Sequence, residues 1–249
     1  ISAKGAAVVT DSKLSLDGLE GKFKENPFKL AAGLNFAAQQ PQPYSLTGSA
    51  DIQNFDVGEF LRAANPNEKP ALDTKATLSA KLNGTGGNIT EVGKNAFGKF
   101  ELSGTKGTMY LLERKGTAGT IVNLGAAALS ILGAARGSDT TAALGEIAKL
   151  LNAVQFETVK LQIERGADLQ FKLSSLEVLS PFLRITGSGT VASKSLDDIQ
   201  NAPMNIVLQM GAKDQLGFLL NRVRLLGTNT DEKGYNLMSR TFTIGGTPS

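Results

Sequence analysis

Histidine and cysteine are both absent from this chain, and each absence removes a class of function. Histidine is the commonest general base and transition-metal ligand, so its absence excludes serine–histidine triads and histidine zinc sites. The lack of cysteine excludes disulfides, thiolate nucleophiles and zinc sites with sulfur ligands. An enzyme built on this chain would therefore depend on carboxylates or lysines.

Dense charge and long hydrophobic runs are also missing. The 26 basic and 23 acidic residues are spread evenly, and no cluster of Lys and Arg offers a phosphate-binding surface, so we expect no nucleic-acid partner. The most apolar stretch, residues 121–135, is shorter than the roughly 20 residues that a membrane span needs. We interpret it as a buried helix, with a lid over a groove and a membrane-inserting hairpin as the alternatives.

Three groups of neighbouring carboxylates are the candidates for acid–base chemistry. They are Asp197-Asp198, Asp231-Glu232, and Asp51 with Asp56. Each group lies at an expected turn or helix start, where aspartate is favoured as a capping residue. We therefore predict no catalytic residues, no metal site and no cofactor.

A short repeat is the most informative feature that is present. It consists of an aliphatic residue, one variable residue, a glycine, and then Ser or Thr. The copies are Leu46-Thr47-Gly48-Ser49, Leu82-Asn83-Gly84-Thr85, Leu102-Ser103-Gly104-Thr105, Ile185-Thr186-Gly187-Ser188 and Ile244-Gly245-Gly246-Thr247. Because glycine in or at the end of a strand marks a bend or a close backbone approach, the repeat predicts many strands that curve at similar points.

Alternation of apolar and polar residues predicts the strands themselves. The expected strands cover residues 28–36, 44–52, 74–82, 99–104, 107–113, 156–164, 168–174, 176–179, 182–191, 204–210 and 236–245. The glycine-rich segment 84–87 predicts a hairpin turn. Apolar spacings of three and four residues predict two short helices, at 57–64 and 214–226, and a helical hairpin insertion at 118–153.

Together these patterns predict a single domain over residues 1–249. We expect a mainly β fold, with an elongated, twisted and curved antiparallel sheet that forms an open apolar groove like a half-barrel. The chain begins at Ile1 without Met and carries no signal peptide, which favours a piece of a longer protein.

The inward alternation predicts which residues line the groove. The expected lining residues are Leu78, Leu82, Phe171, Leu173, Ile185 and Val191. Small residues alternate with large ones on the expected inward faces, as in Ala76, Leu78, Ala80 and Leu82, which leaves room for a ligand. The alternative is an ordinary filled sandwich or barrel core. A one-residue shift in register would turn each of these side chains outward.

The C-terminal part of the chain resembles the C-terminal region of AsmA-like proteins. The resemblance rests on the order of strand 156–166, strand 169–173, and the segment Leu179-Ser-Pro-Phe-Leu-Arg-Ile-Thr-Gly-Ser-Gly-Thr-Val191. The closing segment Phe242-Thr-Ile-Gly-Gly-Thr-Pro248 looks like the family's terminal strand, and residues 98–109 look similar too. The resemblance covers roughly residues 97–248, and more loosely the strands between 5 and 92.

This resemblance implies a non-catalytic protein of the bacterial envelope. AsmA-like and TamB-like proteins are periplasmic, are tethered to the inner membrane by an N-terminal helix, which this chain lacks, and are implicated in moving phospholipid toward the outer membrane. We therefore expect phospholipid or another acyl lipid as partner, with membrane surfaces and other envelope proteins as further contacts. The main alternative is a structural scaffold of the envelope with a filled core; a surface adhesin and a carboxylate-dependent enzyme are two others.

Overall fold

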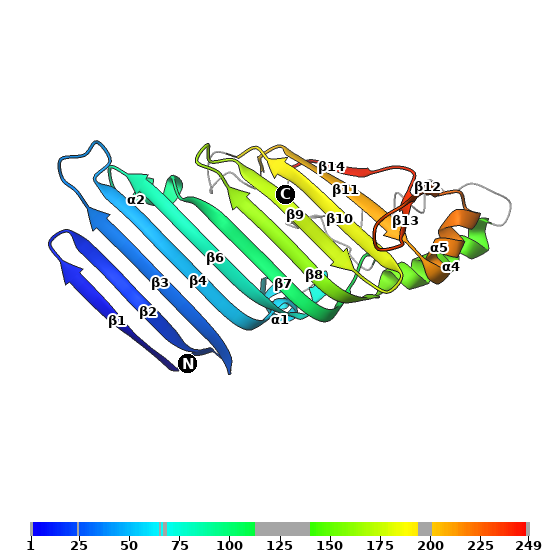
Figure 1. Ribbon diagram of the computed structural model, residues 1–249, viewed down its shortest axis with the longest axis horizontal. Coiled ribbons are helices and arrows are strands. Elements are labelled where there is room, and N and C mark those ends of the chain that lie inside the picture. The colour runs from blue at the N-terminus through cyan, green and yellow to red at the C-terminus, as the bar shows by residue number, and fades with distance from the viewer. Residues whose placement is uncertain are drawn as a thin grey trace.

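The computed structural model describes residues 2–23, 25–64, 66, 69–112, 140–193 and 201–247. In this part of the chain the protein is mainly β, with 60% strand. The strands form one open, 14-stranded antiparallel sheet (Figure 1). Strands that follow one another in the chain mostly pair with one another, in the order β1-β2-β3-β4-β6-β7-β8-β9-β10-β11-β13-β12, while β14 pairs with β11 and β5 with β7.

Four helices are described together with these strands. The elements are β1 (Ser2–Thr10), β2 (Lys13–Phe23), β3 (Asn26–Phe36), β4 (Tyr44–Asp56), α1 (Val57–Ala64), β5 (Leu72–Asp73), β6 (Lys75–Gly86), α2 (Ile89–Lys94), β7 (Phe97–Met109), α4 (Thr140–Asn152), β8 (Val154–Arg165), β9 (Phe171–Leu179), β10 (Leu183–Val191), β11 (Met204–Ala212), α5 (Asp214–Arg222), β12 (Leu226–Thr230), β13 (Asn236–Met238) and β14 (Phe242–Gly246).

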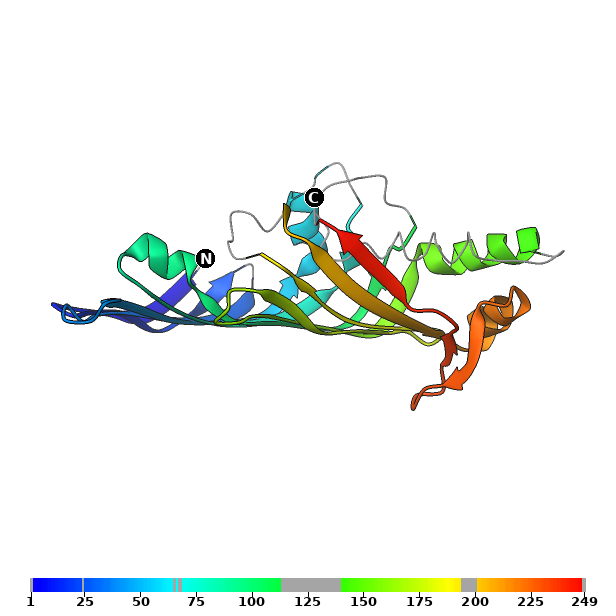
Figure 2. The ribbon, with the colours of Figure 1, turned by 90° about the horizontal axis from the view of Figure 1, so that it is seen from above.

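The two faces of the sheet are unequal. Seen edge-on, α1 and α2 lie on one side, and β11 and β14 bend toward that same side (Figure 2). We call this side the inner face and the opposite side the outer face. The packed core lies on the inner face of β7 to β11, where buried side chains of α4 and α5 join those of the strands.

The mainly β antiparallel fold predicted from the sequence is confirmed, and several predicted boundaries are wrong. The segments 99–104 and 107–113 belong to one strand, β7, and the segments 168–174 and 176–179 to another, β9. An irregularity in the middle of each strand, at Lys106 in β7 and at Ser174 in β9, interrupts the alternation of apolar and polar residues, so the sequence pattern divides each strand in two. The segment 236–245, predicted as one strand, forms β13 and β14.

The predicted helix at 57–64 is confirmed as α1, and its first turn is capped by the Asp56 carboxylate, which accepts the amide of Glu59 at 2.7 Å. The helix predicted at 214–226 is shorter, because α5 ends at Arg222. In the segment 118–153, predicted as a helical hairpin, α4 is a single described helix, and residues 113–139 lie outside the described part of the chain, so the hairpin stays a prediction.

The predicted hairpin turn at residues 84–87 is wrong. Strand β6 continues to Gly86, and α2 begins soon afterwards. Asn88 caps this helix by accepting the amide of Glu91 at 2.9 Å, and the Glu91 carboxylate accepts the amide of Gly87 at 2.8 Å. The pair resembles a capping box, with Asn88 as the N-cap and Glu91 three residues later, except that Glu91 accepts the amide of the residue before the N-cap.

The glycine repeat has a specific structural role. In every copy the aliphatic residue and the glycine are two positions apart, so both belong to the inner face. The glycine permits close packing in some copies: a Cβ atom on Gly84 would lie 2.7 Å from the Val92 carbonyl oxygen of α2. A Cβ atom on Gly48 would meet nothing closer than 3.9 Å, so that copy leaves a shallow space instead.

Candidate functional site

The inner face carries continuous rows of apolar side chains that cross the sheet from strand to strand. Residues that pair across neighbouring strands share a face, so the register identifies each row. One row contains Leu19, Leu30, Ala50, Ala80, Phe100, Ile163, Leu173, Gly189, Ile206 and Ile244. The next contains Ala3, Gly21, Phe28, Ile52, Leu78, Leu102, Leu161, Leu176, Gly187, Leu208 and Phe242. Neither row contains a polar side chain.

Local irregularities keep these rows apolar where the sequence alternation slips. The register of β4 against β6 shifts between Ile52 and Phe55, and Asn54 between them has a positive φ of 52°. A similar shift beside Ser174 separates Leu173 from Leu176 in β9. Each irregularity inserts a residue and returns the following apolar side chains to the inner face.

The apolar face has an open part and a packed part. On β1 to β6 many inner side chains remain accessible: Val9 is 75% exposed and Leu82 is 47% exposed. On β8 to β11 the corresponding side chains form the buried core. The described residues therefore leave the N-terminal part of the inner face partly uncovered, while they enclose the C-terminal part.

All six predicted lining residues lie on the inner face, in different surroundings. Leu78 and Leu82 of β6 lie on its partly uncovered side. Leu173 and Ile185 are 6% and 0% exposed and belong to the packed core. Phe171 and Val191 are half-buried and pair with each other across β9 and β10. The six side chains therefore share one face, but Leu173 and Ile185 are enclosed by protein side chains. That this set lines a lipid groove stays a prediction.

Arg165 is the one charged residue that strand pairing places on the inner face of β1 to β11 and β14 in the described chain. It is buried, and its guanidinium donates to the carbonyl oxygens of Lys94, Ala96 and Leu169. Burial lowers the pKa of Arg165. The side chain therefore satisfies carbonyl groups at the C-terminal end of α2 and holds this helix against β8, a role that the sequence patterns did not indicate.

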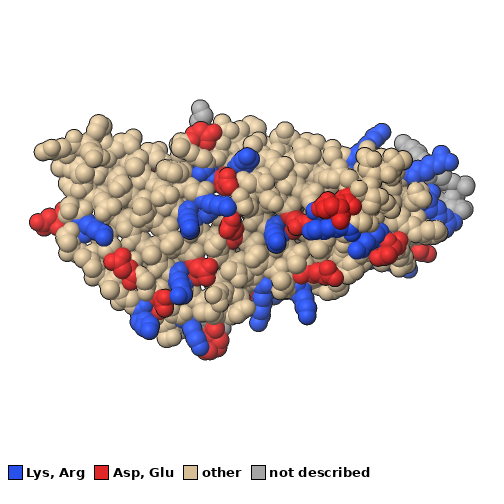
Figure 3. Space-filling model, viewed as in Figure 1, with Lys and Arg blue, Asp and Glu red and all other residues tan. Residues whose placement is uncertain are grey.

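The outer face is polar, with charges of both signs distributed across it (Figure 3). The cross-strand row Lys4, Glu20, Lys29 and Asp51 alternates in sign, and the Lys29 ammonium lies 2.8 Å from the Glu20 carboxylate. The hydrogen bond from Lys29 lowers the pKa of Glu20. Such exposed pairs contribute little to stability. Their effect is to keep this face polar and hydrated.

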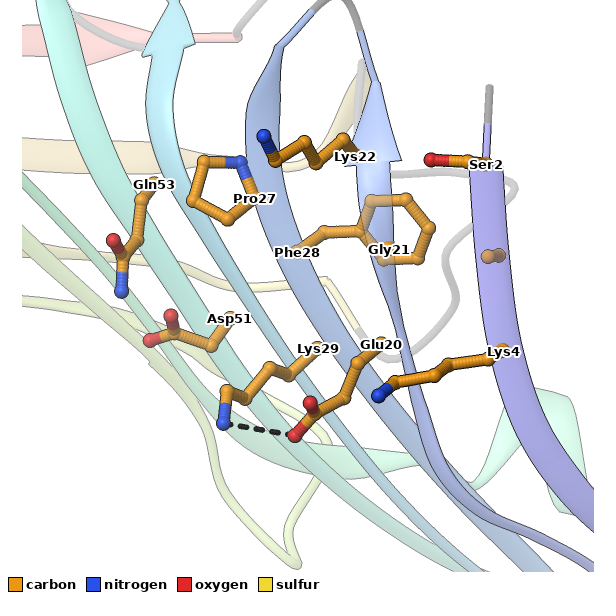
Figure 4. Close-up of a pocket in the computed structure, with 11 residues that line it drawn as sticks. Ser2, Lys4, Glu20, Gly21, Lys22, Pro27, Phe28, Lys29, Asp51 and Gln53 are labelled. Atoms are coloured by element: carbon orange, nitrogen blue, oxygen red, sulfur yellow. Dashed lines mark ion pairs between the residues drawn. The ribbon is translucent and has the colours of Figure 1, made fainter.

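A shallow hollow of about 420 Å³ lies over the outer face of β1 to β4 (Figure 4). The Glu20–Lys29 ion pair lies beside it, with Lys4, Lys22 and Asp51 around its rim. The hollow is open to solvent, and its charged groups point in several directions (Figure 4). We find no arrangement of groups in it that would bind a particular ligand.

A denser ion-pair cluster fastens the β12–β13 turn to the outer face. The Arg184 guanidinium lies 2.7 Å from Asp231 and 2.9 Å from Glu177, and the Lys233 ammonium lies 2.7 Å from Glu177. The hydrogen bond from Lys233, aided by one from Arg184, outweighs burial and lowers the pKa of Glu177. Burial opposes the ionisation of Asp231, but hydrogen bonds from Arg184 and the amides of Tyr235 and Lys233 lower its pKa.

Of the carboxylates considered from the sequence, Asp56, Asp231 and Glu232 have structural contacts in the described chain. Asp56 caps α1, and Asp231 joins the Arg184 cluster; Asp197 and Asp198 lie outside the described residues. No three His, Cys, Asp or Glu side chains in the described residues come together as a metal site. Among the helices described, none is both long enough and apolar enough to span a membrane.

Comparisons with known proteins identified no related protein. No protein-family model matches the chain, and neither a curated protein nor a solved structure is significantly similar to it.

Proposed function

We propose that this protein is a non-catalytic component of the bacterial envelope that binds the acyl chains of phospholipid on the inner face of its sheet. The proposal is supported mainly by the two apolar rows, which continue across the sheet without a polar side chain and are partly uncovered on β1 to β6. The resemblance to AsmA-like proteins adds a periplasmic location and a path between the inner and outer membranes.

The energetics suit a ligand that moves. Each methylene group removed from water contributes about 0.8 kcal/mol, so a long acyl chain is strongly held in any apolar environment. Because the face is apolar and open on one side, an acyl chain can exchange its contacts with one strand for equivalent contacts with the next strand, about 4.8 Å away. The polar head group can remain in water throughout. An uninterrupted row matters because a charged side chain in it would have to be desolvated at each passage.

An envelope scaffold without a lipid ligand is the second candidate. The packed core on β8 to β11 favours it, because Leu173 and Ile185 contact protein side chains there and have no space for a ligand. The two candidates make different predictions only for the partly uncovered part of the face. Lipid binding by the purified chain therefore separates them.

The direct test is to incubate the purified chain with vesicles of phosphatidylethanolamine and phosphatidylglycerol, reisolate it, and quantify the bound phospholipid by mass spectrometry. The informative variant is Leu82→Glu, because Leu82 is on the inner face and already 47% exposed. We expect at least a tenfold loss of bound lipid. The matched control is Asn83→Glu, which adds the same charge to the next residue, exposed on the outer face.

Three results would decide the matter. Bound phospholipid in the wild type and in Asn83→Glu, with loss in Leu82→Glu, supports the proposal. Absence of bound lipid in the wild type refutes it and leaves the scaffold. Equal loss in both variants would mean that charge anywhere on the sheet impairs binding, which contradicts a site on the inner face. Circular dichroism of each variant checks that the sheet is intact.

A further inference from the structure

A cavity of about 670 Å³ lies where β11 changes its pairing partner. Strand β11 pairs with β14 from Met204 to Leu208 and with β13 from Gly211 onward, so Gln209 and Met210 lie between the two partner strands. Residues 239–241 connect β13 to β14 and line the cavity together with Gln209. The interruption in pairing therefore opens a space that a continuous neighbouring strand would fill.

A second irregularity of the sheet borders the same cavity. Leu226 of β12 is opposite Met238 of β13, and Thr230 is opposite Asn236, so residues 227–229 lie opposite the single residue Leu237. Such a bulge bends its strand and redirects side chains, and bulges are frequent beside functional sites. Residues 227–229 and Leu237 all line the cavity. Two separate departures from regular pairing thus meet at one place.

Hydrogen bonds from side chains to the backbone fix the walls of the cavity. The Gln209 amide group donates to the carbonyl oxygens of Met210 at 3.1 Å and Met238 at 3.2 Å, which joins β11 to β13 across the interruption. The backbone amide and the hydroxyl of Ser239 both donate to the Leu225 carbonyl, at 3.1 Å and 3.3 Å. The site is therefore formed before a ligand arrives, which lowers the entropic cost of binding.

Arg240 gives the cavity a charge of one sign. It is the only charged residue among the described residues of the lining. It is exposed, and its guanidinium forms no ion pair or hydrogen bond within the described chain. The carboxylates of the β12–β13 turn are already engaged, because Asp231 and Glu232 each lie 2.7 Å from Arg184. The hollow over β1 to β4 differs, because charges of both signs surround it.

We propose that this cavity binds the phosphate group of a small phosphate ester or a lipid head group, with Arg240 as the anchoring cation. A guanidinium donates two parallel hydrogen bonds to phosphate oxygens. Thr228, Asn229 and Thr241 also line the cavity, and within the described chain their side chains form no hydrogen bond. A planar carboxylate fits the guanidinium alone, whereas a tetrahedral phosphate has further oxygens that accept from these hydroxyl and amide groups. The site is separate from the two apolar rows and does not depend on acyl-chain binding.

Isothermal titration calorimetry of the full chain with glycerol 3-phosphate, at an ionic strength of about 0.15 M, tests the proposal. We expect saturable binding of one ligand per chain, weakened at least tenfold by Arg240→Gln. Thr241→Val keeps the charge and removes a hydroxyl, and it should weaken binding several-fold. The matched control is Arg224→Gln, because Arg224 is also exposed but does not line the cavity. Circular dichroism checks that each variant is folded.

A competition experiment distinguishes the two sources of phosphate. Displacement of bound glycerol 3-phosphate by phosphatidylglycerol vesicles assigns the site to a lipid head group, and binding that such vesicles leave unchanged assigns it to a soluble ester. Four results would overturn the proposal. They are the absence of saturable binding, an equal loss in Arg240→Gln and Arg224→Gln, unchanged binding in Thr241→Val, which would mean simple charge attraction, and acetate binding as tight as that of the phosphate ester.

Discussion

Replacing Ile185 and Leu82 by alanine should have very different effects on stability, although both are large aliphatic residues of the inner face. Ile185 is fully buried, between Val178 and Met210. Ile185→Ala removes three carbon atoms worth about 0.8 kcal/mol each and leaves a cavity, so we expect a loss of about 3 to 5 kcal/mol in the free energy of unfolding.

Leu82→Ala removes the same number of carbon atoms from a side chain that is 47% exposed. About half of the transfer free energy is at stake, and no enclosed cavity forms, so the expected loss is about 1 kcal/mol. Urea unfolding followed by circular dichroism measures both values from the shift of the midpoint at constant slope. Equal losses in the two variants would refute the division of the inner face into a packed part and a partly uncovered part.

Three further outcomes follow from particular contacts. The lowered pKa values of Glu177 and Asp231 mean that their ionised forms stabilise the fold above the ordinary carboxyl pKa values of 4.5 and 3.8; this stability is lost as pH falls below about 4. Asp231→Asn should therefore lower the melting temperature at pH 7 and lower it less at pH 2.5, and a constant difference would contradict the ion-pair role. Gly84→Ala should cost about 1 to 3 kcal/mol in urea unfolding because its Cβ would collide with the Val92 carbonyl, whereas Gly48→Ala should change stability by less than about 0.5 kcal/mol. Arg165→Met should cost about 2 to 4 kcal/mol because the carbonyls of Lys94 and Ala96 lose a charged donor; hydrogen exchange should accelerate in α2 first, and uniform acceleration would argue against local docking.

The antiparallel pairing of the strands, and the face of the sheet on which each side chain lies, could be predicted from the sequence because both depend on local alternation. Leu78 and Leu82, for example, share a face since they are four residues apart in an uninterrupted strand. The glycine repeat contained the same information, because its aliphatic residue and its glycine are two residues apart.

What could not be predicted depends on contacts between distant segments. The helices that lie above the sheet decide that Ile185 is covered and Leu82 is accessible. The periodicity within a strand does not indicate where those helices lie. The role of Arg165 was missed for the same reason, because its partners Lys94 and Ala96 are about 70 positions earlier in the chain. Strand β1 was not predicted because Ala6, Ala7, Val8 and Val9 do not alternate with polar residues.

The alternating signs along Lys4, Glu20, Lys29 and Asp51 have a consequence for the proposed binding of lipid, because they determine how strongly this face would attract an anionic bilayer. Paired opposite charges cancel at distances beyond about 10 Å at moderate ionic strength, so this side generates little long-range field. With a formal net charge of only +3, the chain has weak means of steering itself toward an anionic bilayer. Its association rate with such vesicles should therefore vary little with added salt, in contrast to proteins that approach membranes through a basic patch.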